Sequence, residues 1–284
     1  KEKKMLRNTP ASYKKEYPWL KEVDSLALAN VQMHLESAFC KFFREPSAGF
    51  PRFKSKKSSR KSYTTNVVNG NIFLEGKYLK LPKMTAIRTK LHRPISEKWK
   101  LKSVTVSREP SGKYFAVLNV DFEPEPRPNA GGTIGIDVGI KAFYSDSNGN
   151  TVSNPRYLER SMRKLIREQR RLSRKQKDSH NRGKQRLRVA RVHEKIANQR
   201  NDFLQKQSTM LVRENQTICI EDLNVKGMIR NHKLSKSIAS VSWAKFFEML
   251  EYKAGWYGNE IHRVPTMYPV SYTHLRAHET LANL

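Results

Sequence analysis

Apolar and polar residues follow a helical period in one early segment and a strand-like period in the next. Residues 24–43 carry apolar side chains at helical spacing, and Asp24 or Ser25 can cap the start of the predicted helix. These apolar positions are Leu28, Val31, Leu35, Ala38, Phe39 and Phe42. Residues 63–124 contain short, often alternating apolar segments separated by turn residues, with a hairpin predicted at residues 110–112. We therefore expect a small barrel or an open sheet in this region.

The pattern changes after residue 132. Two apolar segments, residues 133–138 and 217–222, are predicted buried strands, and a hairpin is expected to close near residues 148–150. Residues 156–214 contain no proline and predict two helices broken near residues 180–183. A helix over 242–254 and a short strand at 260–265 complete an alternation typical of an α/β domain. The Pro- and Gly-rich residues 123–132 mark the clearest domain boundary.

Charge narrows the class of partner. The 284 residues include 55 Lys and Arg against 26 Asp and Glu, a formal net charge of +29, while 37% hydrophobic residues suffice for a core. Such an excess repels itself unless a polyanion neutralises it. No apolar run approaches the roughly 20 residues that span a bilayer, and residues 1–8 lack the apolar core of a signal peptide. We expect a nucleic-acid-binding protein of the cytosol.

Two segments concentrate the positive charge. Residues 160–200 hold 16 Lys and Arg against three Asp and Glu, a density that destabilises helices unless something compensates it. Residues 46–65 interleave cations with Phe50, Phe53 and Tyr63, which suits stacking on bases or sugars, although a solvated basic loop remains an alternative. The predicted nucleic-acid-binding residues are Arg52, Lys54, Lys56, Lys57, Arg60, Lys61, Arg163, Lys164, Arg167, Arg170, Arg171, Arg174, Arg186, Arg188 and Arg191.

Two acids stand at apolar strands. Asp137 follows Ile134-Gly135-Ile136, and Glu221 ends Ile218-Cys219-Ile220. A carboxylate among buried apolar residues is costly unless it is paired, hydrogen-bonded or bound to metal. Two of them at strand ends could share Mg²⁺ or Mn²⁺, whose preferred ligands are oxygens and which bridge to phosphate. The alternative is that each acid only caps a turn, and a similar Gly-Ile-Asp-x-Gly turn occurs in actin-like ATPases.

The two cysteines give little chemistry. Cys40 and Cys219 lie far apart, each in an apolar stretch, and we expect two buried thiols rather than a disulfide. Neither belongs to a Cys-x-x-Cys pair, so these residues predict no zinc site.

Several motifs, in order, resemble the TnpB family of transposon-encoded, RNA-guided DNA nucleases. The segments GIDVGIKAFYSDSNG and ICIEDLNVKGM resemble the first and second RuvC motifs of that family. Upstream, GFPRFKSKK, SYTT, LKLPK and SVTVSREPSGKYFAVLNV resemble it in the same order. The resemblance covers nearly everything from about residue 15 to residue 269.

The resemblance implies a mixed α+β and α/β fold in which a barrel-like wedge domain with a helical insertion precedes an RNase H-like (RuvC) domain. The corresponding ranges are 1–50 for an incomplete recognition segment, 51–126 for the wedge, 127–269 for the RuvC domain with its basic hairpin 156–214, and 270–284 for a tail foreign to the family. Asp137 and Glu221 would be the first two metal-binding carboxylates. Family members bind a guide RNA made from the transposon end and cleave matching double-stranded DNA, so the resemblance implies a protein of the prokaryotic cytoplasm, associated with the nucleoid.

The chain also departs from the family pattern. The family continues into a four-cysteine zinc module and a third RuvC aspartate, whereas residues 270–284 contain neither cysteine nor a similar acid motif. We expect this tail to be a frameshift or assembly artefact, and the 284-residue chain to cleave DNA poorly or not at all. Alternatives are a non-catalytic RNA- or DNA-binding regulator of its transposon, a transposase that itself joins strands, and an actin-like ATPase.

Overall fold

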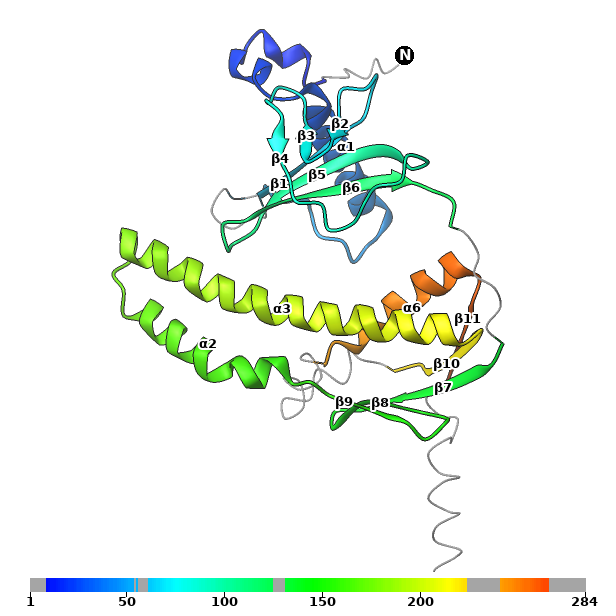
Figure 1. Ribbon diagram of the computed structural model, residues 1–284. Helices are drawn as coiled ribbons and strands as arrows, with labels where there is room; N and C mark the ends of the chain where they lie inside the picture. Colours follow the sequence, from blue (N-terminus) through cyan, green and yellow to red (C-terminus); the bar gives the residue numbers. More distant parts are fainter. Residues whose placement is uncertain (1–8, 54, 56–60, 125–130, 224–240, 266–284) are drawn as a thin grey trace, which may run out of the picture. The chain divides into compact units, whose positions relative to one another are not determined.

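The computed structural model describes residues 9–53, 55, 61–124, 131–223 and 241–265 (Figure 1). The chain divides into two compact units, residues 1–123 and 124–284, and the division falls inside the predicted linker. The described residues form a mixed α+β structure, as the sequence predicts.

Helix α1 (Ser25–Arg44) opens the first unit after two 3₁₀ turns, η1 (Ser12–Lys14) and η2 (Pro18–Lys21). Asp24 caps the helix as predicted, because its Oδ1 accepts a hydrogen bond from the Leu26 amide at 3.2 Å. Its other carboxylate oxygen accepts from the Thr65 hydroxyl. Asn30 Nδ2 donates to the Thr64 carbonyl at 3.0 Å, so polar contacts fix the first turns of the helix on strand β1 (Lys61–Asn66).

The rest of α1 differs from the prediction. Only Ala27 and Asn30 are buried, whereas Val31 and Leu35, expected on the apolar face, are 62% and 54% exposed. Cys40 is also exposed and Cys219 is only partly buried, so the prediction of two buried thiols is wrong for Cys40 and only partly met for Cys219, while both cysteines are free as expected. The physical reason is that the helix packs on the sheet through its first turns, whereas in the later turns Phe39 and Phe42 contact Phe50 and leave Val31 and Leu35 in solvent.

Two three-stranded antiparallel sheets follow in the first unit. One has the order β1-β5-β6, with β5 at Lys100–Arg108 and β6 at Tyr114–Asp121. The other has the order β2-β3-β4, formed by Phe73–Glu75, Tyr78–Lys80 and Ile87–Arg88. Their shared core consists of Ile72, Leu79, Leu81 and Val104.

The described strands of the first unit do not close into a barrel. This corrects the expectation of a barrel-like domain in favour of the open-sheet alternative. The second sheet has strands of only two or three residues, too short to carry a hydrogen-bonded ladder around the core. β6 therefore remains an edge strand, with Tyr114 and Val117 67% and 59% exposed.

The second unit is built on a five-stranded sheet of order β11-β10-β7-β8-β9 (Figure 1). β7 (Thr133–Val138), β8 (Ala142–Asp146) and β9 (Thr151–Ser153) form an antiparallel meander. β10 (Thr217–Glu221) pairs in parallel with β7 on one side and with β11 (Glu260–Val264) on the other. Parallel pairs need long crossovers. The first contains α2 (Tyr157–Ser173) and α3 (His180–Glu214), and the second contains α6 (Trp243–Tyr257).

One face of this sheet carries the core of the unit. Ile134 and Ile136 of β7 and Ile218 and Ile220 of β10 are at most 6% exposed. They pack against Leu204, Leu211 and Val212 of α3 and Trp243, Phe246 and Leu250 of α6. Since side chains alternate along a strand, Gly135, Asp137, Cys219 and Glu221 belong to the opposite face.

The helical hairpin ends where predicted but breaks earlier. α2 ends at Ser173 and α3 begins at His180, so the expected break at residues 180–183 is misplaced. Ser179 sets the start of α3, because its hydroxyl accepts a hydrogen bond from the Arg182 amide at 3.2 Å. Gly183 then lies within the helix. A small cluster of Leu165, Val192 and Ile196 holds the two helices together.

Lys253 is a buried lysine between α6 and α3. It is 5% exposed, and its ammonium donates to Gln205 O, Ser208 Oγ and Thr209 Oγ1 at 3.0, 2.7 and 2.8 Å. All three acceptors are neutral, so hydrogen bonds satisfy the ammonium without a countercharge. Burial lowers the pKa of Lys253 to about 8.

We expect the stability of the chain to rise, relative to Lys253→Met, as the pH increases from about 8 to 10.5. Over this range the unfolded lysine keeps a proton that the buried lysine has lost, so deprotonation favours the folded state. Chemical unfolding of both proteins at several pH values measures the difference. Lys245→Met, at an exposed lysine of the same helix, controls for removing a lysine. A difference that stays constant across the range would contradict the prediction.

Candidate carboxylate centre and nucleic-acid interface

Strand pairing brings the two predicted acidic residues to neighbouring positions. β7 and β10 are parallel, with Ile134 opposite Ile218 and Ile136 opposite Ile220. Asp137 and Glu221 come one residue later on each strand. The isoleucines point into the core, so both carboxylates lie on the face of the sheet away from α3 and α6.

The electrostatics of Glu221 agree with this placement. Partial burial raises the pKa of Glu221, and the negative charge of Asp137 raises it further. Two carboxylates that repel each other at strand ends would be stabilised by a shared cation, and their oxygens are the donors that Mg²⁺ prefers. Among the described residues, no three His, Cys, Asp or Glu side chains gather closely enough to hold a metal ion.

The neighbouring acid, Asp222, has a different environment. Arg263 of β11 donates to Asp222 Oδ1 at 3.0 Å and also pairs with Glu251 of α6. The Asp222 amide donates to the Val264 carbonyl at 2.9 Å. Asp222 therefore has its charge compensated and holds the end of β10 against β11. Sequence reasoning missed Arg263, because nothing in the local pattern reveals which strand it will join.

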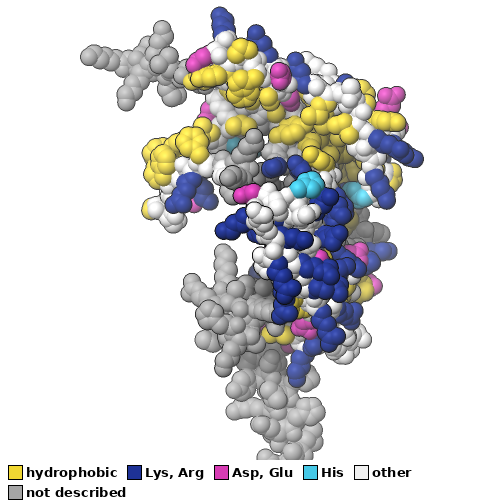
Figure 2. All heavy atoms as spheres, turned by 90° about the vertical axis from the view of Figure 1, so that its left-hand side faces the viewer, with side chains coloured by type: hydrophobic (Ala, Val, Ile, Leu, Met, Phe, Trp, Pro, Cys, Tyr) yellow, Lys and Arg dark blue, Asp and Glu magenta, His cyan; other side chains and the backbone are white. Residues whose placement is uncertain are grey.

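The cations predicted on the helical hairpin are all exposed. Arg163, Lys164, Arg167, Arg170 and Arg171 lie on α2, Arg174 follows that helix directly, and Arg186, Arg188 and Arg191 lie on α3. Figure 2 views the side on which the tips of these helices lie, and Lys and Arg side chains crowd there with few acids between them. Of the predicted basic loop, Arg52 and Lys61 are exposed, and Lys54, Lys56, Lys57 and Arg60 lie outside the described residues.

One buried acid compensates part of this charge. Glu168 of α2 is 6% exposed, and its Oε2 accepts from Gln185 Nε2 of α3 at 2.7 Å. Arg171 donates to its Oε1 at 3.2 Å, and Arg167 lies 3.8 Å from the same oxygen. The hydrogen bond from Gln185, followed by the nearby arginines, lowers the pKa of Glu168 despite burial. The sequence offered no signal for this role beyond an isolated acid in a basic run.

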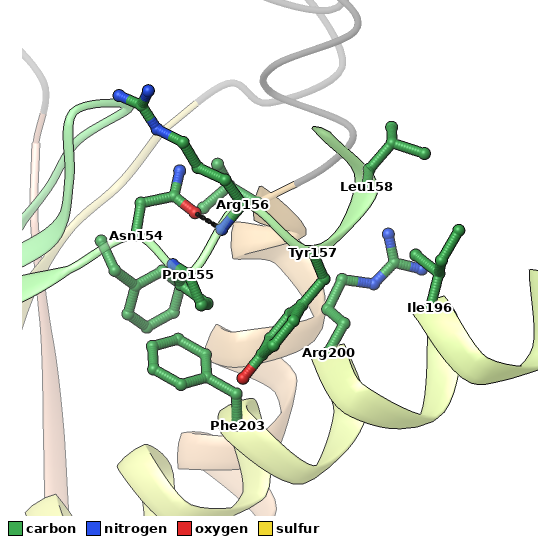
Figure 3. Close-up of a pocket in the computed structure, with 10 residues that line it drawn as sticks. Asn154, Pro155, Arg156, Tyr157, Leu158, Ile196, Arg200 and Phe203 are labelled. Carbon is green, nitrogen blue, oxygen red and sulfur yellow. Dashed lines mark hydrogen bonds between the residues drawn. The ribbon is translucent and has the colours of Figure 1, made fainter. Parts of the chain in front are cut away.

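A small cavity lies where β9 leads into α2 (Figure 3). Arg156 adopts a left-handed conformation with φ 49°, and its amide donates to Asn154 Oδ1 at 3.1 Å. Tyr157 and Phe203 line the cavity, with ring centroids 6.4 Å apart. Its volume of about 20 Å³ suits a single water molecule. The cavity is a gap in the packing where strand β9 meets helix α2, and it is too small for a substrate.

The described part of the chain thus defines a strongly basic, mixed α+β protein with a carboxylate pair at neighbouring strand ends and an arginine-rich helical hairpin. Residues 104–232 match the family model OrfB_IS605, described as a probable transposase. This match, together with the two relatives, bears out the resemblance to the TnpB family that the sequence motifs indicate.

Two relatives illustrate the match. A Streptomyces pristinaespiralis protein, provisionally named an RNA-guided DNA endonuclease, is 40% identical over 261 residues, covering 90% of this chain and 63% of that protein. InsQ of Escherichia coli strain K12, provisionally given the same name, is 31% identical over 270 residues, covering 89% of this chain and 65% of InsQ. The chain spans slightly less than two thirds of the length of these relatives.

A solved structure shares the fold. It is a cryo-EM structure of a Cas12f1–sgRNA–target DNA complex, similar to this chain with a TM-score of 0.50 at 13% identity. The similarity covers 85% of this chain and 61% of the other. At this identity the comparison supports the fold alone.

We expect Asp137→Asn to lower the pKa of Glu221 toward its ordinary value, because the substitution removes a negative charge beside it. Carboxyl ¹³C shifts of labelled glutamate, followed by NMR across the acid pH range, measure the change. Asp222→Asn is the matched control, since its charge is already paired with Arg263. An unchanged Glu221 titration in Asp137→Asn would show that the two carboxylates are not neighbours.

Proposed function

We propose that the chain is part of an RNA-guided DNA endonuclease of a transposon, whose second unit has an RNase H-like, RuvC-type fold. The observation that carries the proposal is the parallel pairing of β7 and β10, which sets Asp137 beside Glu221 on the sheet face opposite the core isoleucines. The names of the relatives supply the activity that such a pair would serve. The proposed site lies within the described residues and can be tested there.

Asp137 and Glu221 would hold a divalent ion, Mg²⁺ or Mn²⁺. Such an ion activates water and stabilises the leaving oxygen of a phosphodiester. The carboxylates fit this role, because burial and then the charge of Asp137 raise the pKa of Glu221, and a bound cation would relieve the repulsion between the two groups. The core isoleucines of β7 and β10 fix the separation of the two strand ends, so the carboxylates are positioned before substrate arrives.

The proposed partners are a guide RNA from the transposon end and a double-stranded DNA target. Exposed arginines and lysines on α2 and α3 would contact phosphate whatever the base, while base pairing between guide and target would read the sequence. Because these partners are a transposon's RNA and its target DNA, the proposed location of the protein is the cytoplasm of a prokaryote. No helix within the described ranges is long and apolar enough to cross a membrane. The zinc module of the family is not assigned to any residue of this chain.

A second candidate function rests on a specific observation. Among the described residues, only two carboxylates approach the proposed centre, and no group of three metal-binding side chains occurs. A two-metal site that lacks a ligand loses both charge and geometry. This favours a non-catalytic RNA- or DNA-binding regulator as the alternative function of the 284-residue chain.

We expect the purified 284-residue chain, given Mg²⁺, a guide RNA and matching DNA, to cleave no faster than its Asp137→Ala variant. The two described carboxylates should bind the ion too weakly for efficient hydrolysis. Gel analysis of labelled DNA measures cleavage, with Asp222→Ala as a control for loss of a nearby acid. Cleavage that requires both Asp137 and Glu221 would contradict this prediction and establish the endonuclease activity in this chain.

RNA binding should survive in the same chain. We expect its affinity to fall steeply as salt rises, with a slope of log K against log[salt] of about −0.7 per phosphate contacted on a single strand. The reason is that cations on the hairpin displace counterions condensed on the nucleic acid. Fluorescence anisotropy with labelled RNA at several salt concentrations measures the slope. A flat salt dependence would argue against binding through these cations.

A further inference from the structure

A hollow lies between α2 and α3. Its volume is about 320 Å³, at the lower end of the range for ligand pockets. Three positions of α2 at spacing i, i+3, i+7 line one wall, namely Ser161, Lys164 and Glu168. Val192, at the bottom of the opposite wall, belongs to the cluster that joins the two helices. The shape of the hollow is therefore tied to the packing of the hairpin.

Cations dominate the lining. Arg188, Arg191 and Lys195 repeat the same i, i+3, i+7 spacing on α3, facing Lys164 across the hollow. Within the described part of the chain, none of these four forms an ion pair within 4.0 Å of an acid. Four cations around one hollow fit a phosphate group, since charge-assisted hydrogen bonds to phosphate are the strong ones.

Glu168 makes the hollow more selective than a simple phosphate site. It is the one acid in the lining, and its hydrogen bonds to Gln185 and Arg171 keep it ionised. A carboxylate has about four acceptor positions, so these two partners leave acceptor capacity for a ligand. A carboxylate repels phosphate alone, but it favours a ligand that presents a hydroxyl donor beside its phosphate.

We propose that this hollow binds one ribose-phosphate unit of an RNA backbone, with the four cations around the phosphate and Glu168 accepting a hydrogen bond from the 2′-hydroxyl. The 2′-hydroxyl is the group by which a protein distinguishes RNA from DNA at a given site. No aromatic side chain lines the hollow, so the base is not read by stacking on a ring there. The site is thus selective for RNA and indifferent to sequence. The inference rests on the proposed function only in assuming that the chain binds nucleic acid.

The ribose contact is tested on the unaltered 284-residue chain. The probes are a single-stranded RNA of mixed sequence, its 2′-O-methyl analogue and the DNA of the same sequence. We expect RNA to bind at least about tenfold more tightly than either analogue, the effect of one hydrogen bond to a charged acceptor. Glu168→Met should reduce this preference by a similar factor. Equal binding of RNA and its 2′-O-methyl analogue would overturn the ribose assignment, whatever happens to the variant.

The phosphate contact is tested by a matched pair of double variants on α3. Arg191→Ala/Lys195→Ala removes two cations from the hollow, and Lys206→Ala/Arg213→Ala removes the same two residue types from exposed positions of α3 outside it. We expect the first double variant to weaken the binding of RNA and of DNA by about tenfold more than the second. We also expect it to reduce the steepness of log K against log[salt] by about 1.

The outcomes separate this inference from the proposed function. Equal losses in the two double variants would overturn the phosphate site and leave nucleic-acid binding intact. A preference for RNA that Glu168→Met leaves unchanged would also overturn the assignment of the hydroxyl to Glu168. If the unaltered chain bound neither RNA nor DNA, the proposed function and this site would both fail.

Discussion

The second unit depends on the parallel pairing of β7 with β10. These strands are far apart in the sequence, and a long crossover through α2 and α3 separates them. Their isoleucines become buried only when both strands meet beneath α3 and α6. The same register that aligns Ile136 with Ile220 places Asp137 beside Glu221. Burial of apolar surface on one face thus opposes the electrostatic repulsion between carboxylates on the other.

Much of this unit could be predicted from the sequence, for identifiable reasons. β7 and β10 are compact apolar segments bounded by breakers, and a segment of this kind forms a buried strand in many contexts. Asp137 and Glu221 stood out because an acid next to such a strand requires an explanation. The hairpin was visible in its length and charge. Its break was misplaced because the Ser179 cap determines the start of α3, whereas Gly183 drew attention as a helix breaker.

The errors lie where tertiary contacts decide the outcome. The apolar spacing of α1 predicted a buried face, yet the helix packs through Asp24 and Asn30, so Val31 and Cys40 stay exposed. The predicted barrel does not form, because the short strands β2 to β4 leave β6 at a sheet edge. The alternation of apolar and polar residues does not reveal strand length. Glu168 and Arg263 escaped notice because their partners, Gln185 and Asp222, come from other elements. The local sequence pattern predicts individual helices and strands. It predicts contacts between them only when the burial of apolar residues determines which elements pair.

Helix α3 participates in both halves of the second unit. Its early turns line the hollow through Arg188 and Lys195, and its late turns pack against the sheet through Leu204 and Leu211. With 35 residues it is about 52 Å long, an uninterrupted rod. The helix therefore fixes both the distance and the relative orientation between the cationic hollow and the strands that carry the carboxylates. One residue inserted between them would turn the hollow by about 100° around the helix axis, so this stretch should tolerate substitution far better than a change in length.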